Sequence, residues 1–167
     1  MEDSDKFAFE GKWGGSAQTV FNSEGEEIIK YKEELEIKLV KTKPVQVYSI
    51  NSSTWKDDES DFPLHFENGL LKLIPSGEKF KVETSFAHPF GLCEFSYGVY
   101  DPTTKEMISE ATVESLLRGK SAKGSKTTGF KRHYQIIDDN VLHYKMYLGV
   151  EGRDLYHHLT ANLSKIE

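Results

Sequence analysis

Residues 28–40 read IIKYKEELEIKLV, and the pattern of this stretch decides the fold. Every second residue from Ile29 to Leu39 is apolar except Glu33, and the residues between them are lysine or glutamate. A period of two puts alternate side chains on opposite faces of a β-strand, whereas a helix needs apolar residues three and four apart. The Glu and Lys content alone would also suit a helix, but the spacing predicts a strand with one face on a core and the other in water.

The rest of the chain continues as short strands separated by turns. Residues 45–55 alternate again, turn residues at Asn68-Gly69 and at 75–77 predict hairpins, and residues 130–148 predict a last hairpin. About ten such strands in series, with no long stretch of helical period, predict an all-β fold: a single antiparallel up-and-down β-barrel, with a β-sandwich as the alternative. A barrel of this size encloses a cavity, which the aromatic residues, 12% of the chain, can either line or fill.

Composition narrows the class of protein. At 167 residues and with no linker, the chain predicts one barrel domain over residues 9–167 after a flexible N-terminus at residues 1–8. The formal charge of −6 and the pI near 5.6 argue against nucleic acid as a partner, and no segment is long and apolar enough for a membrane span. The chain starts without a signal-peptide pattern and has a single cysteine, so we expect a cytoplasmic protein, with the nucleus left open.

The tail, residues 155–163, reads LYHHLTANL and predicts a closing strand with a histidine pair at its entrance. Imidazole is the commonest protein ligand for a metal, and a strand end at a barrel mouth is a natural place to hold one. His157 and His158 point to opposite faces of a regular strand. Alternation with Leu159 favours His157 as the inward residue, whereas a β-bulge would turn His158 inward. The pattern predicts one ligand histidine and leaves its identity open.

Other candidate features have ordinary explanations. The loop at residues 118–129, RGKSAKGSKTTG, resembles a phosphate-binding loop, but Ser125 stands where that motif needs lysine and no helix pattern follows. We therefore expect a solvated basic loop. Cys93 lies among apolar residues, which predicts a buried and inert thiol. His65, at a strand end beside a turn, is a better site candidate than the histidines of the last hairpin.

Five short motifs follow one another between residues 11 and 163. They are Gly11-Lys12-Trp13-Gly14-Gly15, Tyr31-Lys32-Glu33-Glu34, Pro63-Leu64-His65 followed by Glu67 and Gly69, Gly91-Leu92-Cys93-Glu94-Phe95, and His158-Leu159 followed by Ala161. In the same order they resemble the G-x-W-x-G, Y-x-E-E, P-M-H-x-E-x-G, G-V-V-E-V and H-L-x-A motifs of the nitrobindins. These are small all-β heme proteins whose barrel is similar to that of lipocalins and fatty-acid-binding proteins.

The resemblance implies a cofactor and an activity. In nitrobindins a histidine at the place of His158 ligates ferric heme b, so the resemblance implies His158 as the axial ligand of the metal. The other implied cofactor contacts are Leu64 and His65 on the distal wall and Gly11, Trp13 and Gly15 in the opening motif. Family members bind nitric oxide and isomerise peroxynitrite to nitrate, and the resemblance alone implies these activities here, with no catalytic residue named.

Two other functions stay open at this point. The first is an intracellular carrier of a fatty acid or another small apolar ligand, without heme. The second is an interaction barrel whose own aromatic side chains fill the interior. Ser16 and Ala17 stand where nitrobindins have further glycines, and residues 151–154 lengthen the loop before His158, so the contacts with a macrocycle can differ from those of the family. The oligomeric state is not predicted.

Overall fold

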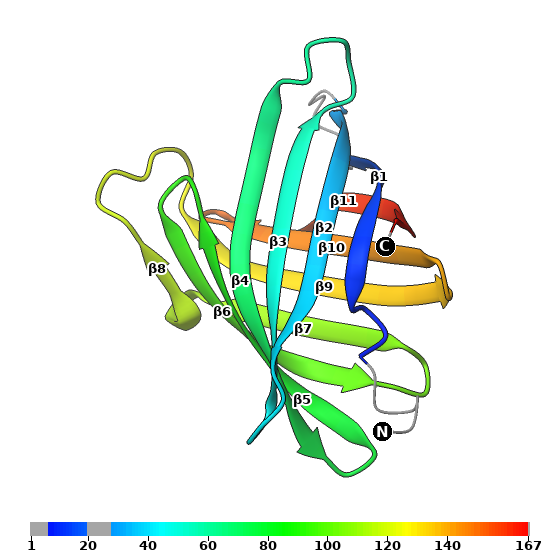
Figure 1. Cartoon of the computed structure of the whole chain (residues 1–167). Helices are drawn as coiled ribbons and strands as arrows, with labels where there is room; N and C mark the ends of the chain where they lie inside the picture. The colour runs from blue at the N-terminus through cyan, green and yellow to red at the C-terminus, as the bar shows by residue number, and fades with distance from the viewer. Residues whose placement is uncertain (1–6, 20–27, 167) are drawn as a thin grey trace.

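Figure 1 shows a computed structural model of the chain, in which residues 7–19 and 28–166 are described. The strands are β1 (Gly11–Thr19), β2 (Lys30–Lys41), β3 (Gln46–Lys56), β4 (Pro63–Ser76), β5 (Lys79–His88), β6 (Leu92–Asp101), β7 (Glu106–Thr112), β8 (Leu116–Arg118), β9 (Thr127–Asp138), β10 (Val141–Val150) and β11 (Arg153–Lys165). Within these residues the helical structure is one 3₁₀ turn, η2 (Val113–Ser115).

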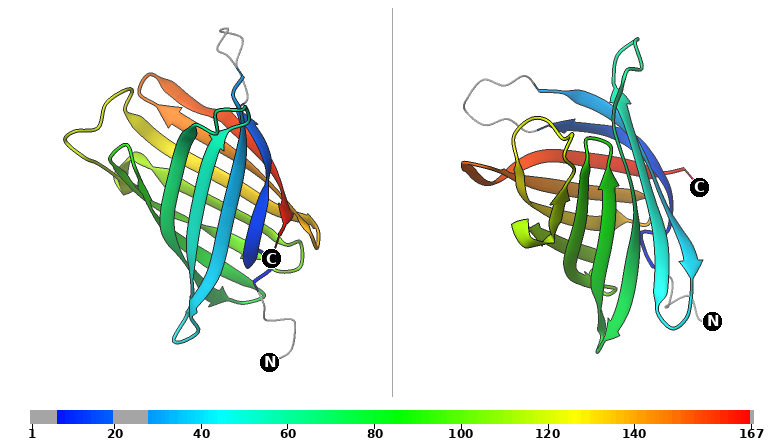
Figure 2. Two further views of the ribbon diagram at one scale, coloured as in Figure 1. Left: turned by 45° about the horizontal axis from the view of Figure 1, so that its top comes forward. Right: turned by 90° about the vertical axis from the view of Figure 1, so that its left-hand side faces the viewer.

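Antiparallel pairing closes the sheet into a ring. The strand order is β5-β4-β3-β2-β1-β11-β10-β9-β7-β6, and β5 also pairs with β6. The three-residue strand β8 pairs with the end of β6 and lies outside this ring of ten. In Figure 1, β2, β3 and β4 cross in front of β9, β10 and β11, and Figure 2 shows the same sheet wrapping around in two further views. The predicted single antiparallel barrel is confirmed.

The two-faced strand predicted from residues 28–40 is β2. Its buried side chains are Tyr31, Glu33, Leu35 and Ile37, and the lysine and glutamate side chains between them are exposed or half-buried. β2 pairs with β1 and β3, so this alternation fixes which faces of the neighbouring strands point inward. The inner face of β2 therefore carries one carboxyl group, that of Glu33, among apolar side chains.

Large apolar side chains fill one end of the barrel. Trp13 and Leu163 are fully buried there, on the paired strands β1 and β11. The Phe7 ring packs against two tyrosines, with its centroid 4.8 Å from that of Tyr48 and 4.9 Å from that of Tyr100. These residues belong to one continuous cluster of buried side chains. The cluster closes this end, so any cavity must lie toward the opposite end.

The packed structure already includes the residues just before β1. Phe7 is 2% exposed and Phe9 is 0% exposed. The Ala8 amide donates a hydrogen bond to the Tyr100 hydroxyl at 3.3 Å. Residues 7 and 8 therefore pack with the barrel, although the sequence places them in a flexible N-terminus at 1–8. Residues 1–6 and 167 lie outside the described residues.

One predicted turn is wrong. Asn68 and Gly69 lie inside β4, which runs without a break from Pro63–Ser76. A Cβ atom at position 69 would come within 2.3 Å of the Ser85 carbonyl oxygen and 2.6 Å of the Phe86 ring. The glycine therefore allows β5 to approach closely, and its residue type is explained by packing rather than by a turn. The turn predicted around 75–77 is confirmed between β4 and β5.

The prediction that Cys93 is buried is also wrong. Leu92 and Glu94 point inward on β6, so the side chain between them is exposed on the outer face. The apolar surroundings misled the prediction because they are themselves on the outside: Phe95 is 54% exposed. The Cys93 thiol therefore faces away from the interior.

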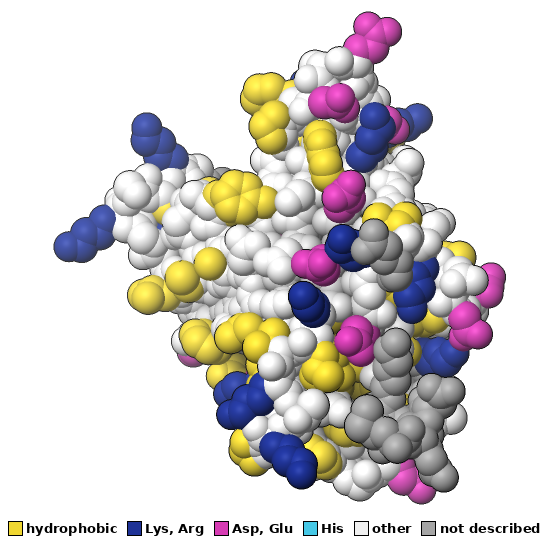
Figure 3. All heavy atoms as spheres, in the orientation of Figure 1, with side chains coloured by type: hydrophobic (Ala, Val, Ile, Leu, Met, Phe, Trp, Pro, Cys, Tyr) yellow, Lys and Arg dark blue, Asp and Glu magenta, His cyan; other side chains and the backbone are white. Residues whose placement is uncertain are grey.

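The outer face mixes charged and apolar side chains. Figure 3 shows Lys and Arg interspersed with Asp and Glu on one side of the molecule, with apolar side chains between them. Surface ion pairs such as Lys72 with Glu83 (3.5 Å) contribute about 0–1 kcal/mol each, so the interior determines stability. None of the helical segments in residues 7–19 and 28–166 has the length and hydropathy needed to cross a membrane.

A matched pair of glycines in β1 tests its close approach to β11. A Cβ atom at Gly15 would lie 2.6 Å from the Asn162 carbonyl oxygen, whereas at Gly14 the nearest atom is a flexible one, Ile166 Cδ1, at 3.4 Å. We expect Gly15→Ala to lower the free energy of unfolding by about 1–3 kcal/mol, the usual cost of overpacking. Gly14→Ala is the control, and its free energy of unfolding should stay within about 1 kcal/mol of the wild-type value. Urea denaturation measures both, and equal losses would contradict the close approach.

Candidate functional site

A cavity of about 340 Å³ opens at the end of the barrel opposite the filled core. It lies where β1, β3, β5 and β10 finish and where β2, β4, β9 and β11 begin. Its volume falls in the range of pockets that bind small molecules and cofactors. Much of the lining is apolar: Ile29, Leu64, Phe90, Phe130, Met146, Leu148 and Leu159. The aromatic residues of this chain therefore fill one end of the barrel and leave the other end hollow.

A β-bulge in β11 turns His158 into this cavity. Met146 of β10 pairs with Leu159, and the next residue, Tyr147, pairs with His157, so His158 is skipped in the register. As a result His158 and Leu159 both line the cavity. Alternation on a regular strand would have made His157 the inward residue, and the extra residue reverses that expectation.

His157 is engaged outside the cavity. Its Nε2 lies 2.9 Å from the Thr160 hydroxyl and 3.1 Å from the Leu159 carbonyl oxygen. Its ring stacks on Tyr147, with 5.1 Å between ring centroids. His158 instead meets the Tyr156 ring edge-on, at 5.9 Å. The two histidines therefore have different surroundings, and the one that the family motif indicates faces the cavity.

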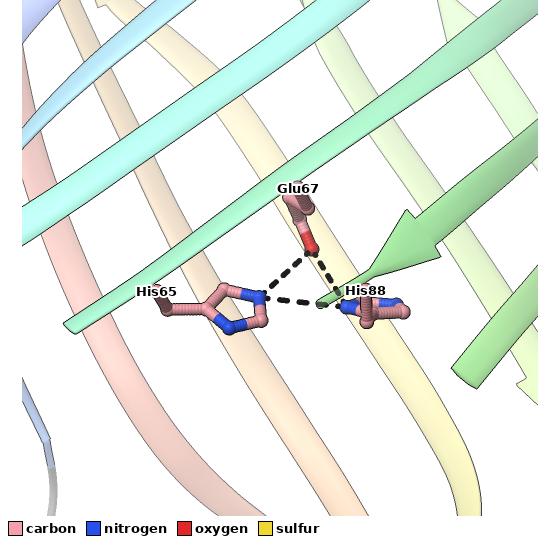
Figure 4. Close-up of side chains that lie close together, drawn as sticks. All are labelled: His65, Glu67 and His88. Atoms are coloured by element: carbon pink, nitrogen blue, oxygen red, sulfur yellow. Dashed lines mark hydrogen bonds and ion pairs between the residues drawn. The ribbon is translucent and has the colours of Figure 1, made fainter. Parts of the chain in front are cut away.

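Across the barrel from His158, three polar side chains point toward one another (Figure 4). In the ring of ten strands β5 lies directly opposite β11, and β4 is its neighbour. His65 and Glu67 come from β4, two residues apart and on the same face, and His88 is the last residue of β5. His88 Nδ1 lies 3.5 Å from His65 Nε2 and 3.4 Å from Glu67 Oε2. All three residues line the cavity, and we call them the His-Glu-His cluster.

Arg132 of β9 supports this cluster from inside the wall. Its guanidinium is buried between the rings of Phe86 and Phe130, 4.8 and 5.0 Å from their centroids. One Nη atom donates to Glu94 and the other donates to Glu67 Oε2 at 3.3 Å. The buried Arg132 therefore fixes two carboxylates that lie on different strands, β4 and β6.

The charge of Arg132 keeps both carboxylates ionised although the site is buried. Burial alone would raise the pKa of Glu94, but the Arg132 charge and hydrogen bonds from His88, Arg132 and Ser96 lower it to about 2. The pKa of Glu67 is also lowered: burial raises it, but Arg132 together with His65 and His88 lowers it by more. The pKa of Arg132 is raised by the same two carboxylates. Ionised Glu94 faces His88 Nε2 at 3.0 Å and can accept its proton.

Glu33 forms a second buried polar group at the inner side of the cavity. Tyr144 donates to Glu33 Oε2 at 2.5 Å, and Ser52 donates to Oε1 at 2.9 Å. Glu94 pairs with the Arg132 guanidinium, whereas none of the ion pairs among the described residues includes Glu33. Burial raises its pKa to about 7, more than its two hydrogen bonds lower it.

The raised pKa of Glu33 predicts a pH-dependent stability. Its carboxyl group has its ordinary pKa of 4.5 in the unfolded chain and a pKa of about 7 in the folded protein, so the folded state loses stability as the pH rises between these values. We expect the stability of the wild type, relative to Glu33→Gln, to fall across this window and to stay level on either side. Urea denaturation at a series of pH values measures this difference. Glu34→Gln, on the exposed face of β2, should run parallel to the wild type; a parallel Glu33→Gln curve would contradict the prediction.

The structure brings together only part of the predicted site. His158, Leu64 and His65 line the cavity, whereas Gly11, Trp13 and Gly15 are not among its lining residues. Trp13 is buried in the filled end and donates from its indole Nε1 to the Phe9 carbonyl oxygen at 2.9 Å. Gly11 has a φ of 136°, which favours glycine. The opening motif therefore has packing and backbone roles in this barrel.

Sequence reasoning missed Glu67, His88, Glu94 and Arg132 as a group. His88 lies where the sequence suggests a turn, and Arg132 and Glu94 face inward on strands that look ordinary. A signal was available in the spacing: His65 and Glu67 are two apart, as are Glu94 and Ser96, so each pair shares a strand face. Which of these faces meet depends on the register between paired strands and on the curvature of the barrel, which no local pattern contains.

These features fit a heme. The His158 imidazole on a bulged strand would hold the iron, and the apolar side chains that line the cavity suit a macrocycle. A β-barrel with this arrangement defines a class, the heme-binding barrel proteins. Residues 7–165 match the family model described as "THAP4-like, heme-binding beta-barrel domain", and the chain belongs to this family. The resemblance to nitrobindins is confirmed, and heme is the cofactor.

Known proteins with similar sequence and structure support this family assignment. The chain is 29% identical over 123 residues to peroxynitrite isomerase 2 of Mycobacterium ulcerans, covering 74% of this chain and 71% of that protein. It is 26% identical to a peroxynitrite isomerase of Frankia alni, covering 70% and 80%. The crystal structure of Rv2717c from M. tuberculosis superposes with a TM-score of 0.79 at 26% identity, covering 96% of this chain and 94% of that one.

The two competing functions are less well supported. An interaction barrel filled by its own aromatic side chains does not agree with the cavity. The family match does not favour a carrier of apolar ligands without heme. The charged group of Arg132, Glu67 and Glu94 beside the cavity is also an unusual wall for a purely apolar ligand.

Proposed function

We propose that this protein binds heme through His158, isomerises peroxynitrite to nitrate and binds nitric oxide. The observation that carries the proposal is the bulge that places the His158 imidazole in a largely apolar cavity, across from a polar wall. The names of the relatives, peroxynitrite isomerases, support the reaction. The proposed heme contacts are His158 on one side and Leu64 and His65 on the other.

In this proposal the protein chain binds the heme, orients the reacting molecule and excludes water from the cavity. When bound, ferric heme supplies a Lewis-acidic iron for an anionic oxidant and for nitric oxide. His158 would hold the iron from β11, where the bulge turns its side chain into the cavity. Leu64, Phe90 and Met146 make the cavity apolar, which limits water near the reacting molecule. His65, whose side chain is 36% exposed, lies at the accessible part of the opposite wall and can donate a hydrogen bond to an anion there.

The reaction is tested by following peroxynitrite decay and its products. We expect the hemin-loaded protein to accelerate the decay in proportion to its concentration and to raise the yield of nitrate at the expense of nitrite. Apoprotein at the same concentration should do neither. Hemin-loaded His157→Ala, which leaves the cavity intact, should behave like the wild type. Decay with unchanged products would rule out isomerisation while leaving heme binding in place.

We also infer a cytoplasmic location. A chain with one cysteine, exposed and unpaired in this structure, suits a reducing compartment. Fractionation of the source cells, followed by immunoblotting, checks this inference. Recovery in a secreted fraction would contradict it.

A further inference from the structure

The His-Glu-His cluster has the dimensions of a metal site that is separate from the heme ligand. His65 Nε2, Glu67 Oε2 and His88 Nδ1 are 3.4, 3.5 and 3.9 Å from one another. The ligand atoms of a tetrahedral zinc ion, with bonds of about 2.0–2.1 Å, lie roughly 3.4 Å apart. These three residues are also the group of potential metal ligands found within the described part of the chain. The donor atoms therefore already form one face of a metal's coordination shell.

The hydrogen bonds around His88 direct its Nδ1 toward the other two donor atoms, His65 Nε2 and Glu67 Oε2. Ionised Glu94, held by Arg132 and Ser96, accepts the proton on His88 Nε2 at 3.0 Å. In a neutral His88 this leaves a lone pair on Nδ1, which lies 3.4 Å from the carboxylate oxygen of Glu67. Two electron-rich atoms at this distance repel each other unless a proton or a metal ion lies between them. A carboxylate that orients the far nitrogen of a histidine is also the usual outer shell of a metal ligand.

The combined charge of Arg132, Glu67 and Glu94 also favours a cation between the three donor atoms. Arg132 carries one positive charge, and Glu67 and Glu94 carry one negative charge each, so one negative charge is uncompensated. Burying an uncompensated charge is costly. A proton could balance it but can be shared by only two of the three donor atoms, whereas a metal ion contacts all three.

The surrounding side chains hold the donors in place and leave one position accessible. The His88 ring stacks on Phe130 with 5.4 Å between centroids and 10° between planes. Phe90 lies beside both imidazoles, 5.4 Å from the His88 ring and 6.0 Å from the His65 ring. All three donors line the cavity, which supplies the fourth coordination position and an entry path past His65. Rigid donors lower the cost of ordering the site on binding.

We propose that His65, Glu67 and His88 bind a divalent transition-metal ion of the Zn²⁺ class on the cavity wall opposite His158. Two imidazoles and one carboxylate with an open fourth position form the ligand set of catalytic zinc sites and of non-heme iron sites. The site needs no heme, so it goes beyond the proposed function and can fail or succeed independently of it. In the folded protein it would place a second metal ion in the cavity that the heme enters.

The test is titration of the full chain, freed of metal by a chelator and without heme, with Zn²⁺ in a calorimeter and with Co²⁺ by visible absorption. We expect one ion per chain and the intense absorption of four-coordinate Co²⁺. His65→Ala and Glu67→Gln should each weaken Zn²⁺ binding by more than about 100-fold, because loss of even an outer-shell partner costs about 10–100-fold. His65 is partly exposed and Gln keeps the shape of Glu67, so both variants should fold.

The matched control is His133→Ala. This histidine lies on the outer face of β9, where its Nε2 is 3.0 Å from Glu106 Oε1, so it also pairs with a carboxylate but lies outside the cavity. Its loss should leave the affinity and the Co²⁺ spectrum unchanged. Absence of saturable binding by the wild type would overturn the proposal. So would Zn²⁺ binding that survives unchanged in His65→Ala and Glu67→Gln.

Discussion

His158→Ala should bind hemin on the order of 100-fold more weakly than the wild type, by analogy with structural zinc sites, in which four ligands gain about 10–16 kcal/mol in total, or roughly 3 kcal/mol per ligand. The bulge in β11 makes His158 the histidine of the tail pair that faces the cavity. The remaining affinity comes from burial of the macrocycle against the apolar lining. Absorbance of the Soret band during hemin titration measures the change.

His157→Ala is the control for this prediction. The two histidines are adjacent in sequence, but His157 bonds to Thr160 and stacks on Tyr147. We expect it to keep the hemin affinity of the wild type. Added imidazole should restore the spectrum of His158→Ala, since a free ligand can enter the space that the side chain leaves. A larger loss in His157→Ala than in His158→Ala would contradict the assignment.

Arg132→Met should cost about 3–5 kcal/mol of folding stability at neutral pH, the usual result of removing one partner of a buried ion pair. Arg132 is 2% exposed and pairs with both Glu67 and Glu94, so its removal leaves two carboxylates without their cation. Methionine retains much of the volume and the contact with Phe86 and Phe130, which separates the effect of charge from that of packing. Urea denaturation measures the loss.

The pH dependence identifies the cause of this loss. The pKa of Glu94 is lowered from 4.5 to about 2 in the folded wild type, so the stability that its ionised form contributes is complete above 4.5 and is lost as the pH falls toward 2. Arg132→Met lacks most of this contribution, and its deficit should therefore shrink in acid. Lys131→Met, whose side chain pairs with Glu110 on the outer face at 2.8 Å, should lose less than about 1 kcal/mol. Equal losses in the two variants would contradict the role of Arg132.

The sequence predicts the fold well because the decisive information is local. Alternation in β2 and turn residues between strands specify an antiparallel barrel without knowledge of distant contacts. The exceptions are also physical. Gly69 is required by the close approach of β5 rather than by a turn, and Cys93 lies in an apolar stretch that faces outward. A glycine can serve a turn or a close approach of two strands, and a cysteine in an apolar stretch can face either side of the sheet. Only the three-dimensional structure distinguishes these alternatives.

The site is less predictable because its residues meet across the ring. His65 and Leu64 follow from the resemblance, and both line the cavity. Arg132 could not be connected with them, since it comes from β9, far from β4 in the sequence, and their contact depends on the curvature of the barrel. His88 lies on β5, which pairs directly with β4, but the register of that pairing is not visible in the local pattern. The bulge at His158 is likewise invisible to a period-two pattern, which by itself favours its neighbour.

Titration of the wild-type apoprotein with hemin tests most directly the claim that this barrel holds one heme in its cavity. We expect a Soret band that grows to a sharp end point at one hemin per chain, because His158 is the histidine of the tail pair that faces the cavity. Absorbance that increases without saturation, or that saturates at the same level in the presence of the His158→Ala change, would contradict it.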